Sequence, residues 1–169
     1  MGLLWATFAQ ARAVELSSVN FSSQRLPGVV NPWYEAQVDL RSVGASAVEN
    51  VSVSLFLSFD RGGRTYYFHG SEKISLVDRN ICARFYIPGD IAEAYQLPVR
   101  PTDFVLEIST PEGKEELGSR GASAGLTAPD KQKSFISVAK GGRELLPHYK
   151  TPFYSLSASL KDLPAYDIP

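Results

Sequence analysis

The chain has 169 residues, of which 44% are hydrophobic and 21% are charged. This composition is typical of one globular domain with a hydrophobic core, and it excludes a largely disordered chain. The formal net charge of −1 argues against a nucleic-acid-binding protein, because such proteins present a basic face to phosphates. With one cysteine, Cys82, no intrachain disulfide can form, and we expect this residue to be a small buried side chain in a strand.

The N-terminal segment has features of the end of a secretory signal. A short apolar run at residues 2–9 precedes Ala11-Arg12-Ala13, which places small residues at the two positions that a signal peptidase recognises. We therefore expect residues 1–13 to be the remnant of a signal, and the mature protein to be secreted, periplasmic or on the cell surface. Because the run is short and no Lys or Arg precedes it, a plain apolar N-terminus is the alternative. No other stretch reaches the ~20 apolar residues of a membrane span.

From residue 14 onward, apolar side chains alternate with polar ones, which indicates strands with one face on a core and the other in water. Residues 33–41 and 51–59 show this pattern most clearly. In these segments the side chains predicted to face the core are Tyr34, Ala36, Val38, Leu40, Val51, Val53, Leu55, Leu57 and Phe59. Glu35, on the other face of the first segment, is predicted to face water.

Turn residues separate the remaining segments. Gly62 and Gly63 predict a tight hairpin, because paired glycines accept the positive φ values that such turns require. Further strands are expected over residues 65–69, 72–77, 80–87, 103–109, 113–118 and 135–138. Residues 88–95 are predicted to form the single short helical turn, and residues 118–133, which are rich in Gly, Ala, Ser and Pro, a loop.

About seven to nine short, mostly antiparallel strands predict an all-β chain with an immunoglobulin-like β-sandwich fold. The Cys…Trp…Cys pattern of antibody domains is absent, so the sandwich lacks their disulfide, and a Greek-key barrel is the alternative. We assign residues 14–142 to this domain. Residues 143–169 form either a closing strand, around residues 154–160, or a C-terminal tail.

No arrangement of residues in the sequence points to catalysis, a cofactor or a metal ion. His69 and His148 are the only histidines, and neither belongs to a metal-ligand spacing. There is no Gly-x-Ser-x-Gly motif, and residues 118–125 lack the Gly-Lys-Ser/Thr ending of a phosphate-binding loop. We therefore predict that the chain is not an enzyme and that it has no catalytic, cofactor-binding or metal-binding residues.

Clustered aromatic residues are the candidates for binding, namely Trp33, Tyr66, Tyr67, Tyr149 and Tyr154. Exposed Trp and Tyr side chains stack on sugar rings or anchor a protein partner. The alternative is that half of each cluster belongs to the core, since alternation forces one of Tyr66 and Tyr67 inward. A carbohydrate-binding surface would require Trp33, Tyr66 and Tyr67 to lie coplanar on one exposed face.

Three sequence stretches carry a resemblance: Pro27-Gly28-x-x-Asn31-Pro32-Trp33-Tyr34-Glu35-Ala36-Gln37-Val38, Tyr67-Phe68-His69-Gly70 and Ala83-Arg84-Phe85-Tyr86-Ile87-Pro88. Through them the chain resembles a small family of exported immunoglobulin-like proteins encoded beside type IV pilus genes in verrucomicrobial bacteria. The resemblance implies a pilus-associated or surface structural role, protein partners in the envelope or pilus machinery, and no catalysis. A pilin needs a long apolar N-terminal helix, which the sequence does not show, so we expect the chain to assist or decorate a pilus.

The resulting expectation is a non-catalytic exported structural or interaction protein that acts through protein–protein contacts. Strand edges and the C-terminal segment are the surfaces that we expect it to present to a partner. The alternative is a carbohydrate-binding β-sandwich module.

Overall fold

The computed structural model describes residues 14–44, 47–76, 80–111, 113–117, 126 and 128–154. Its strands are β1 (Val14–Gln24), β2 (Trp33–Ser42), β3 (Val48–Arg61), β4 (Arg64–Leu76), β5 (Asn80–Ile87), β6 (Asp103–Thr110), β7 (Gly113–Leu117), β8 (Arg143–Glu144) and β9 (Leu146–Pro147). Its helices are α1 (Gly89–Ala94), α2 (Pro129–Lys140) and the short 3-10 helix η2 (His148–Lys150). The residues before β1 lie outside this description, so the signal sequence remains a prediction.

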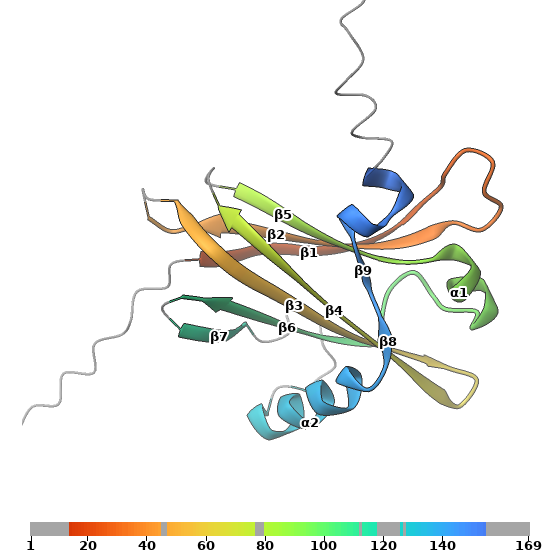
Figure 1. Ribbon diagram of the computed structural model, residues 1–169. Coiled ribbons are helices and arrows are strands. Elements are labelled where there is room, and N and C mark those ends of the chain that lie inside the picture. The colour runs from red at the N-terminus through yellow and green to blue at the C-terminus, as the bar shows by residue number, and fades with distance from the viewer. Residues whose placement is uncertain are drawn as a thin grey trace, which may run out of the picture.

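Two β-sheets form the layers of a sandwich (Figure 1). Sheet A has the strand order β1-β2-β5-β9, and sheet B has the order β7-β6-β3-β4-β8. All neighbouring strands are antiparallel except β4 and β8. The predicted all-β sandwich is confirmed.

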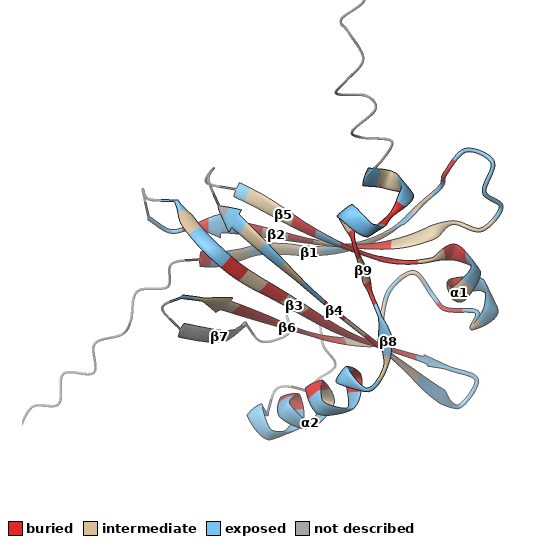
Figure 2. Ribbon diagram, viewed as in Figure 1, coloured by how far each residue is buried: buried red, intermediate tan, exposed pale blue. Residues whose placement is uncertain are grey.

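The core lies between the sheets and contains the side chains that alternation placed there (Figure 2). Its buried members include Ala36, Val38, Leu40, Val51, Val53, Leu55, Leu57, Phe59, Ala83, Phe85, Ile87, Phe104, Leu106 and Ile108. The predicted hairpin is also confirmed: Arg61 pairs with Arg64, and Gly62 and Gly63 between them have φ values of 59° and 75°. The helical turn predicted at residues 88–95 is α1.

Several details of the sequence interpretation are wrong. The strands predicted at residues 65–69 and 72–77 are one strand, β4, which pairs with β3 without a break at Gly70. The strand predicted at residues 135–138 is part of α2, which begins at Pro129. This helix also takes in residues 129–133 of the predicted loop, so the turn at residues 88–95 is not the single helical segment. Cys82 is only half-buried and lies on the outer face of sheet A instead of in the core; burial raises the pKa of its thiol.

Helix α2 covers the outer face of sheet B (Figure 1). Its residues Ile136 and Ala139 pack against Phe56 of β3 and Val105 of β6 in a second, smaller apolar cluster. This helix explains why Phe56 and Val105 are buried although they point away from the main core.

Residues 143–154, which we call the C-terminal clasp, cross the near edge of the sandwich from sheet B to sheet A (Figure 1). Strand β8 pairs with Phe68 and His69 of β4, and β9 pairs with Phe85 and Tyr86 of β5. Between them Leu145 enters the core and is 1% exposed. The described part of residues 143–169 therefore closes the sandwich, whereas the strand proposed at residues 154–160 falls almost wholly outside the described residues.

Candidate binding surface

Five ring-bearing side chains lie together on the outer face of sheet A. We call Trp33, Tyr86, His148, Phe153 and Tyr154 the aromatic cluster. Trp33 begins β2 and Tyr86 lies near the end of β5, each on the face opposite to its core-facing neighbours. The other three come from η2 and from the helical turn at residues 152–154. The clasp therefore completes a surface that two neighbouring strands begin.

Phe153 holds the cluster together. Its ring stacks on Tyr86, with centroids 4.9 Å apart and planes 18° apart, and it meets Trp33 edge-on at 5.7 Å. His148 lies 5.8 Å from the Tyr86 ring, and Tyr154 meets His148 edge-on at 5.9 Å. Contacts of this kind contribute about 0.5–1.5 kcal/mol each beyond the area that they bury. The rings leave Tyr86 only 1% exposed.

Beneath the rings, a hydrogen-bonded chain joins the clasp to sheet A. The Tyr86 hydroxyl donates to Glu35 Oε2 at 2.7 Å and lies 3.2 Å from His148 Nδ1. Glu35 and Tyr86 are direct cross-strand partners of β2 and β5, so their side chains share one face. Because the tyrosine donates its single proton to the carboxylate, His148 must carry its proton on Nδ1 to complete the chain.

The placement of Glu35 corrects the sequence interpretation. It was predicted to face water, but it is 8% exposed. The residue does lie on the outer face of β2, as alternation requires, and the clasp covers that face with Tyr86's partners His148 and Phe153. A second layer over an outer face leaves no mark on the alternation of a strand.

Burial sets the protonation states of Tyr86 and His148 in this hydrogen-bonded network. Desolvation, followed by the hydrogen bond and the charge of Glu35, raises the pKa of Tyr86 well above its ordinary value. Desolvation and the positive charge of Arg84 lower the pKa of His148, with Glu35 opposing them. At neutral pH the tyrosine is therefore a protonated donor and the imidazole is neutral, and the arrangement fastens the clasp.

The five residues chosen from the sequence occupy different surfaces. Trp33 and Tyr154 belong to the aromatic cluster, and Tyr149 lies next to His148 in η2. Tyr66 packs against the core and against Tyr95, with ring centroids 4.6 Å apart. Tyr67 lies on the outer face of sheet B, 6.0 Å from the ring of Phe135. Trp33, Tyr66 and Tyr67 thus do not form one coplanar face.

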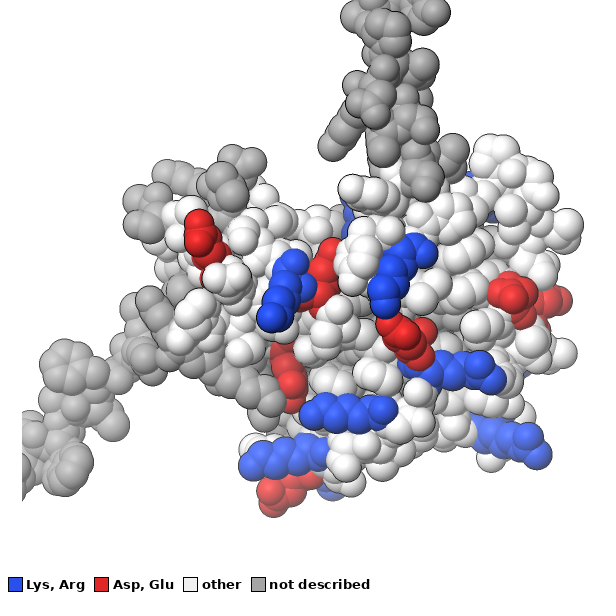
Figure 3. Space-filling view, in the orientation of Figure 1, with Lys and Arg blue, Asp and Glu red and all other residues white. Residues whose placement is uncertain are grey.

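The aromatic cluster and the neighbouring Tyr149 together form what we call the aromatic surface. Only part of this surface is open to solvent. Tyr149 is 55% exposed and Tyr154 is 50% exposed. The loop that leads into Trp33 carries two exposed apolar side chains of its own, Val29 and Val30. On the face shown in Figure 3, Lys and Arg side chains are interspersed with Asp and Glu, with no large field of one sign.

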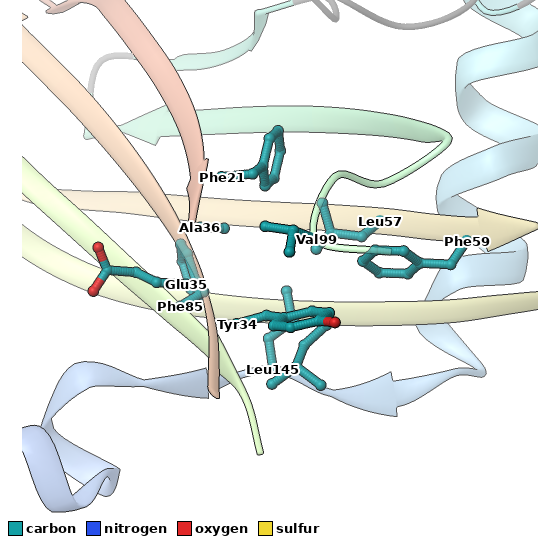
Figure 4. Close-up of a pocket in the computed structure, with 10 residues that line it drawn as sticks. Phe21, Tyr34, Glu35, Ala36, Leu57, Phe59, Phe85, Val99 and Leu145 are labelled. Carbon is teal, nitrogen blue, oxygen red and sulfur yellow. The ribbon is translucent and has the colours of Figure 1, made fainter. Parts of the chain in front are cut away.

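A small cavity lies between the sheets, lined by apolar side chains that include Phe21, Phe85 and Leu145 (Figure 4). Its volume of about 10 Å³ admits about one water molecule. The carboxylate of Glu35 points away from these apolar side chains (Figure 4). This cavity therefore has no room for a small-molecule ligand.

Two further observations concern the described residues alone. They contain no group of three or more His, Cys, Asp and Glu side chains arranged to hold a metal ion. Among the helices of the described segments, none is long and apolar enough to cross a membrane.

No protein-family model matches the sequence, and no curated protein matches it. The fold is similar to that of a crystal structure from Akkermansia muciniphila, with a TM-score of 0.60. The similarity covers 86% of this chain and 89% of that chain, at 10% sequence identity. At this identity it establishes a shared fold.

Proposed function

We propose that this chain is a non-catalytic exported protein of the cell surface or pilus machinery, and that it binds another envelope protein through the aromatic surface on the clasp. The observation that carries the proposal is the exposure of Tyr149 and Tyr154 on a segment whose other rings are anchored. Tyrosine is enriched among the residues that dominate protein interfaces. A side chain held in place before binding loses less entropy when the partner arrives.

Two further observations support a binding role without catalysis. The hydrogen-bonded chain from His148 to Glu35 lies under the aromatic rings, where a substrate cannot reach the buried Tyr86 hydroxyl. The fold match comes from a verrucomicrobial bacterium, as does the pilus-associated family that the sequence resembles.

Carbohydrate binding is the second candidate, because half-exposed tyrosines also stack on sugar rings. Only Tyr149 and Tyr154 of the five residues chosen from the sequence are exposed. Tyr66 and Tyr67, which a three-residue sugar platform with Trp33 would need, lie on other surfaces. The protein partner is therefore the stronger candidate.

The test replaces both exposed tyrosines, Tyr149→Ser and Tyr154→Ser, in one variant. Val138→Ser is the matched control, because Val138 is 50% exposed but lies on α2, across the molecule. After cross-linking in the native envelope, we expect recovery of the partner to fall about tenfold or more for the double variant and to stay unchanged for the control. Thermal unfolding should show all three proteins folded, with the double variant less stable only by about the 0.5–1.5 kcal/mol of the lost contact between Tyr154 and His148.

Equal recovery of the same proteins with all three chains would contradict the proposal. Titration with oligosaccharides, followed by NMR, separates the second candidate. Saturable shifts at Tyr149 and Tyr154 would favour sugar binding over the protein partner.

A further inference from the structure

Strand β1 is a long sheet edge that no described strand covers. It has 11 residues and pairs with β2 on one side, and it stands first in the order of sheet A. The backbone N–H and C=O groups along such an edge can pair with a strand of another molecule.

Natural edge strands usually carry charges, prolines or bulges that prevent this pairing. In β1 the segment from Leu16 to Gln24 contains no charged residue, no proline and no glycine. Its one irregularity, between Leu16 and Ser18, lies near its beginning and leaves Ser18 to Gln24 in regular register with β2. Within the described part of the chain, most of this edge is therefore unprotected.

The described residues also leave the hydrophobic core open on this side. Leu16, Val19 and Phe21 of β1 pack against the core but are only half-buried. Phe21 meets Phe104 of β6 edge-on at 5.4 Å, at the rim of the sandwich. A strand added beside β1 would bury more of these side chains as well as the backbone edge.

We propose that the strand which pairs with β1 is β1 of a second copy of this chain, antiparallel and related by a two-fold axis near Asn20. The strand is self-complementary in this arrangement. Asn20 lies opposite Asn20 of the second copy, and Ser18 lies opposite Ser22, which gives neutral hydrogen-bonding pairs on the outer face. Val19 lies opposite Phe21 on the inner face, a β-branched–aromatic pair of the kind that stabilises sheets.

Charge is complementary as well. Glu15 lies at the beginning of β1, where it pairs with Arg41 of β2, and Arg25 directly follows the end of β1. An antiparallel arrangement brings the glutamate end of one copy beside the arginine end of the other, twice across the axis. The two A sheets then become one continuous sheet. This proposal does not depend on the aromatic surface.

Sedimentation of the full chain from micromolar to millimolar concentration tests the proposal, with a monomer–dimer equilibrium as the expected result. Asn20→Lys places two like charges opposite each other and should raise the dissociation constant about fivefold. Asn20 is exposed, so the variant keeps its fold, which thermal unfolding verifies. Ser75→Lys, the same charge on an exposed serine of β4, is the control and should change nothing.

Cross-linking tests the register. In a Cys82→Ala background, Asn20→Cys should form a disulfide-linked dimer under mild oxidation, and Lys73→Cys on the exposed face of β4 should not. A monomer at every concentration overturns the proposal. A dimer that is insensitive to Asn20→Lys, or that does not cross-link through residue 20, also overturns it, because that dimer uses another surface.

Discussion

The two edges of the sandwich are built in opposite ways. At the β4–β5 edge the chain covers its own strands with the clasp, and Glu72 of β4 reaches across to accept a hydrogen bond from the backbone N–H of Arg84 in β5. At the β1 edge no described strand covers the outer side of β1, and three side chains that pack against the core remain half-buried. A short segment of irregular backbone is thus enough to finish a hydrophobic core that the strands alone leave open.

Two glycines, Gly70 and Gly142, allow close contact between β4 and the segment that leads through the clasp. A Cβ atom at Gly70 would lie 2.8 Å from the Leu145 Cβ, and one at Gly142 would lie 2.3 Å from the carbonyl oxygen of Tyr67. The Leu145 N–H donates to the carbonyl of His69 at 2.7 Å. The guanidinium of Arg143 lies 4.9 Å above the ring of Tyr95 and donates to its hydroxyl. The closed edge therefore depends on backbone contact as much as on side-chain burial.

The largest expected effect comes from shortening apolar side chains to alanine at the two edges and comparing the losses of stability. Leu145→Ala should cost about 2–5 kcal/mol of unfolding free energy, as Leu55→Ala in the middle of β3 should, because both side chains are fully buried. Val19→Ala at the β1 edge should cost only about 1 kcal/mol, since this side chain is half-buried. Urea denaturation measures all three. A loss below about 0.5 kcal/mol for Leu55→Ala would refute the strand register, and equal losses for Leu145→Ala and Val19→Ala would remove the contrast between the edges.

The next effect concerns the backbone contact at β8. Gly142→Ala should destabilise the protein by about 1–3 kcal/mol, because its methyl group would overlap the main chain of Tyr67. Gly141→Ala is the matched control: the nearest atom lies 3.5 Å from its Cβ position, and its φ of −83° suits alanine. Two variants of equal stability would show that the clasp does not sit tightly on β4.

Truncation after Pro147 separates the two roles of the clasp, which are to cover the edge of the sheets and to carry the aromatic rings. The shortened chain keeps β8, Leu145 and β9, so the edge stays covered, but it loses the rings of His148 and Phe153 over Tyr86. We expect a loss of about 1–3 kcal/mol from the missing ring contacts, and a folded protein that no longer binds its envelope partner. Complete unfolding of the truncated chain would show instead that residues 148–154 are what holds the sandwich closed.

The core could be predicted from the sequence because burial on one face leaves a period of two. This worked for Val38, Leu55 and Leu106, each of which was assigned to the core face of its strand and is buried. It failed where a second layer covers the outer face, as α2 covers Phe56 and the clasp covers Glu35. Such a cover comes from a distant part of the chain, so the strand's own pattern cannot contain it.

The same reason limited the prediction of the aromatic surface. Trp33 and Tyr154 could be chosen as clustered aromatics, but Tyr86, His148 and Phe153 could not be joined to them. Their meeting depends on the register that sets Glu35 beside Tyr86 and on the path of the clasp. In α2, by contrast, a local signal was present: Pro129 and Asp130 in the first turn, followed by apolar residues at helical spacing in Ile136 and Ala139.

The smallest expected effect is a pH dependence that only the closed edge should show, since β1 contains no histidine. The pKa of His148 is lowered in the folded protein by burial and by Arg84, while Glu35 acts in the opposite direction. A group with a lowered pKa stabilises the fold above its ordinary value of 6.5, and this contribution is lost as the pH falls through 6.5 and then through the lower folded value. Acidification from pH 7.5 to about 5 should therefore loosen the clasp.

Hydrogen exchange at the Leu145 and Val19 amides measures this loosening on the two edges separately. We expect exchange at Leu145 to accelerate, after correction for the intrinsic rate, while exchange at Val19 stays unchanged. His148→Gln keeps a hydrogen-bond donor but does not titrate, so it should abolish the difference. Burial raises the pKa of Glu72, but this residue is present in both proteins and cancels in the comparison. The same acceleration in His148→Gln would assign the effect to a group other than His148.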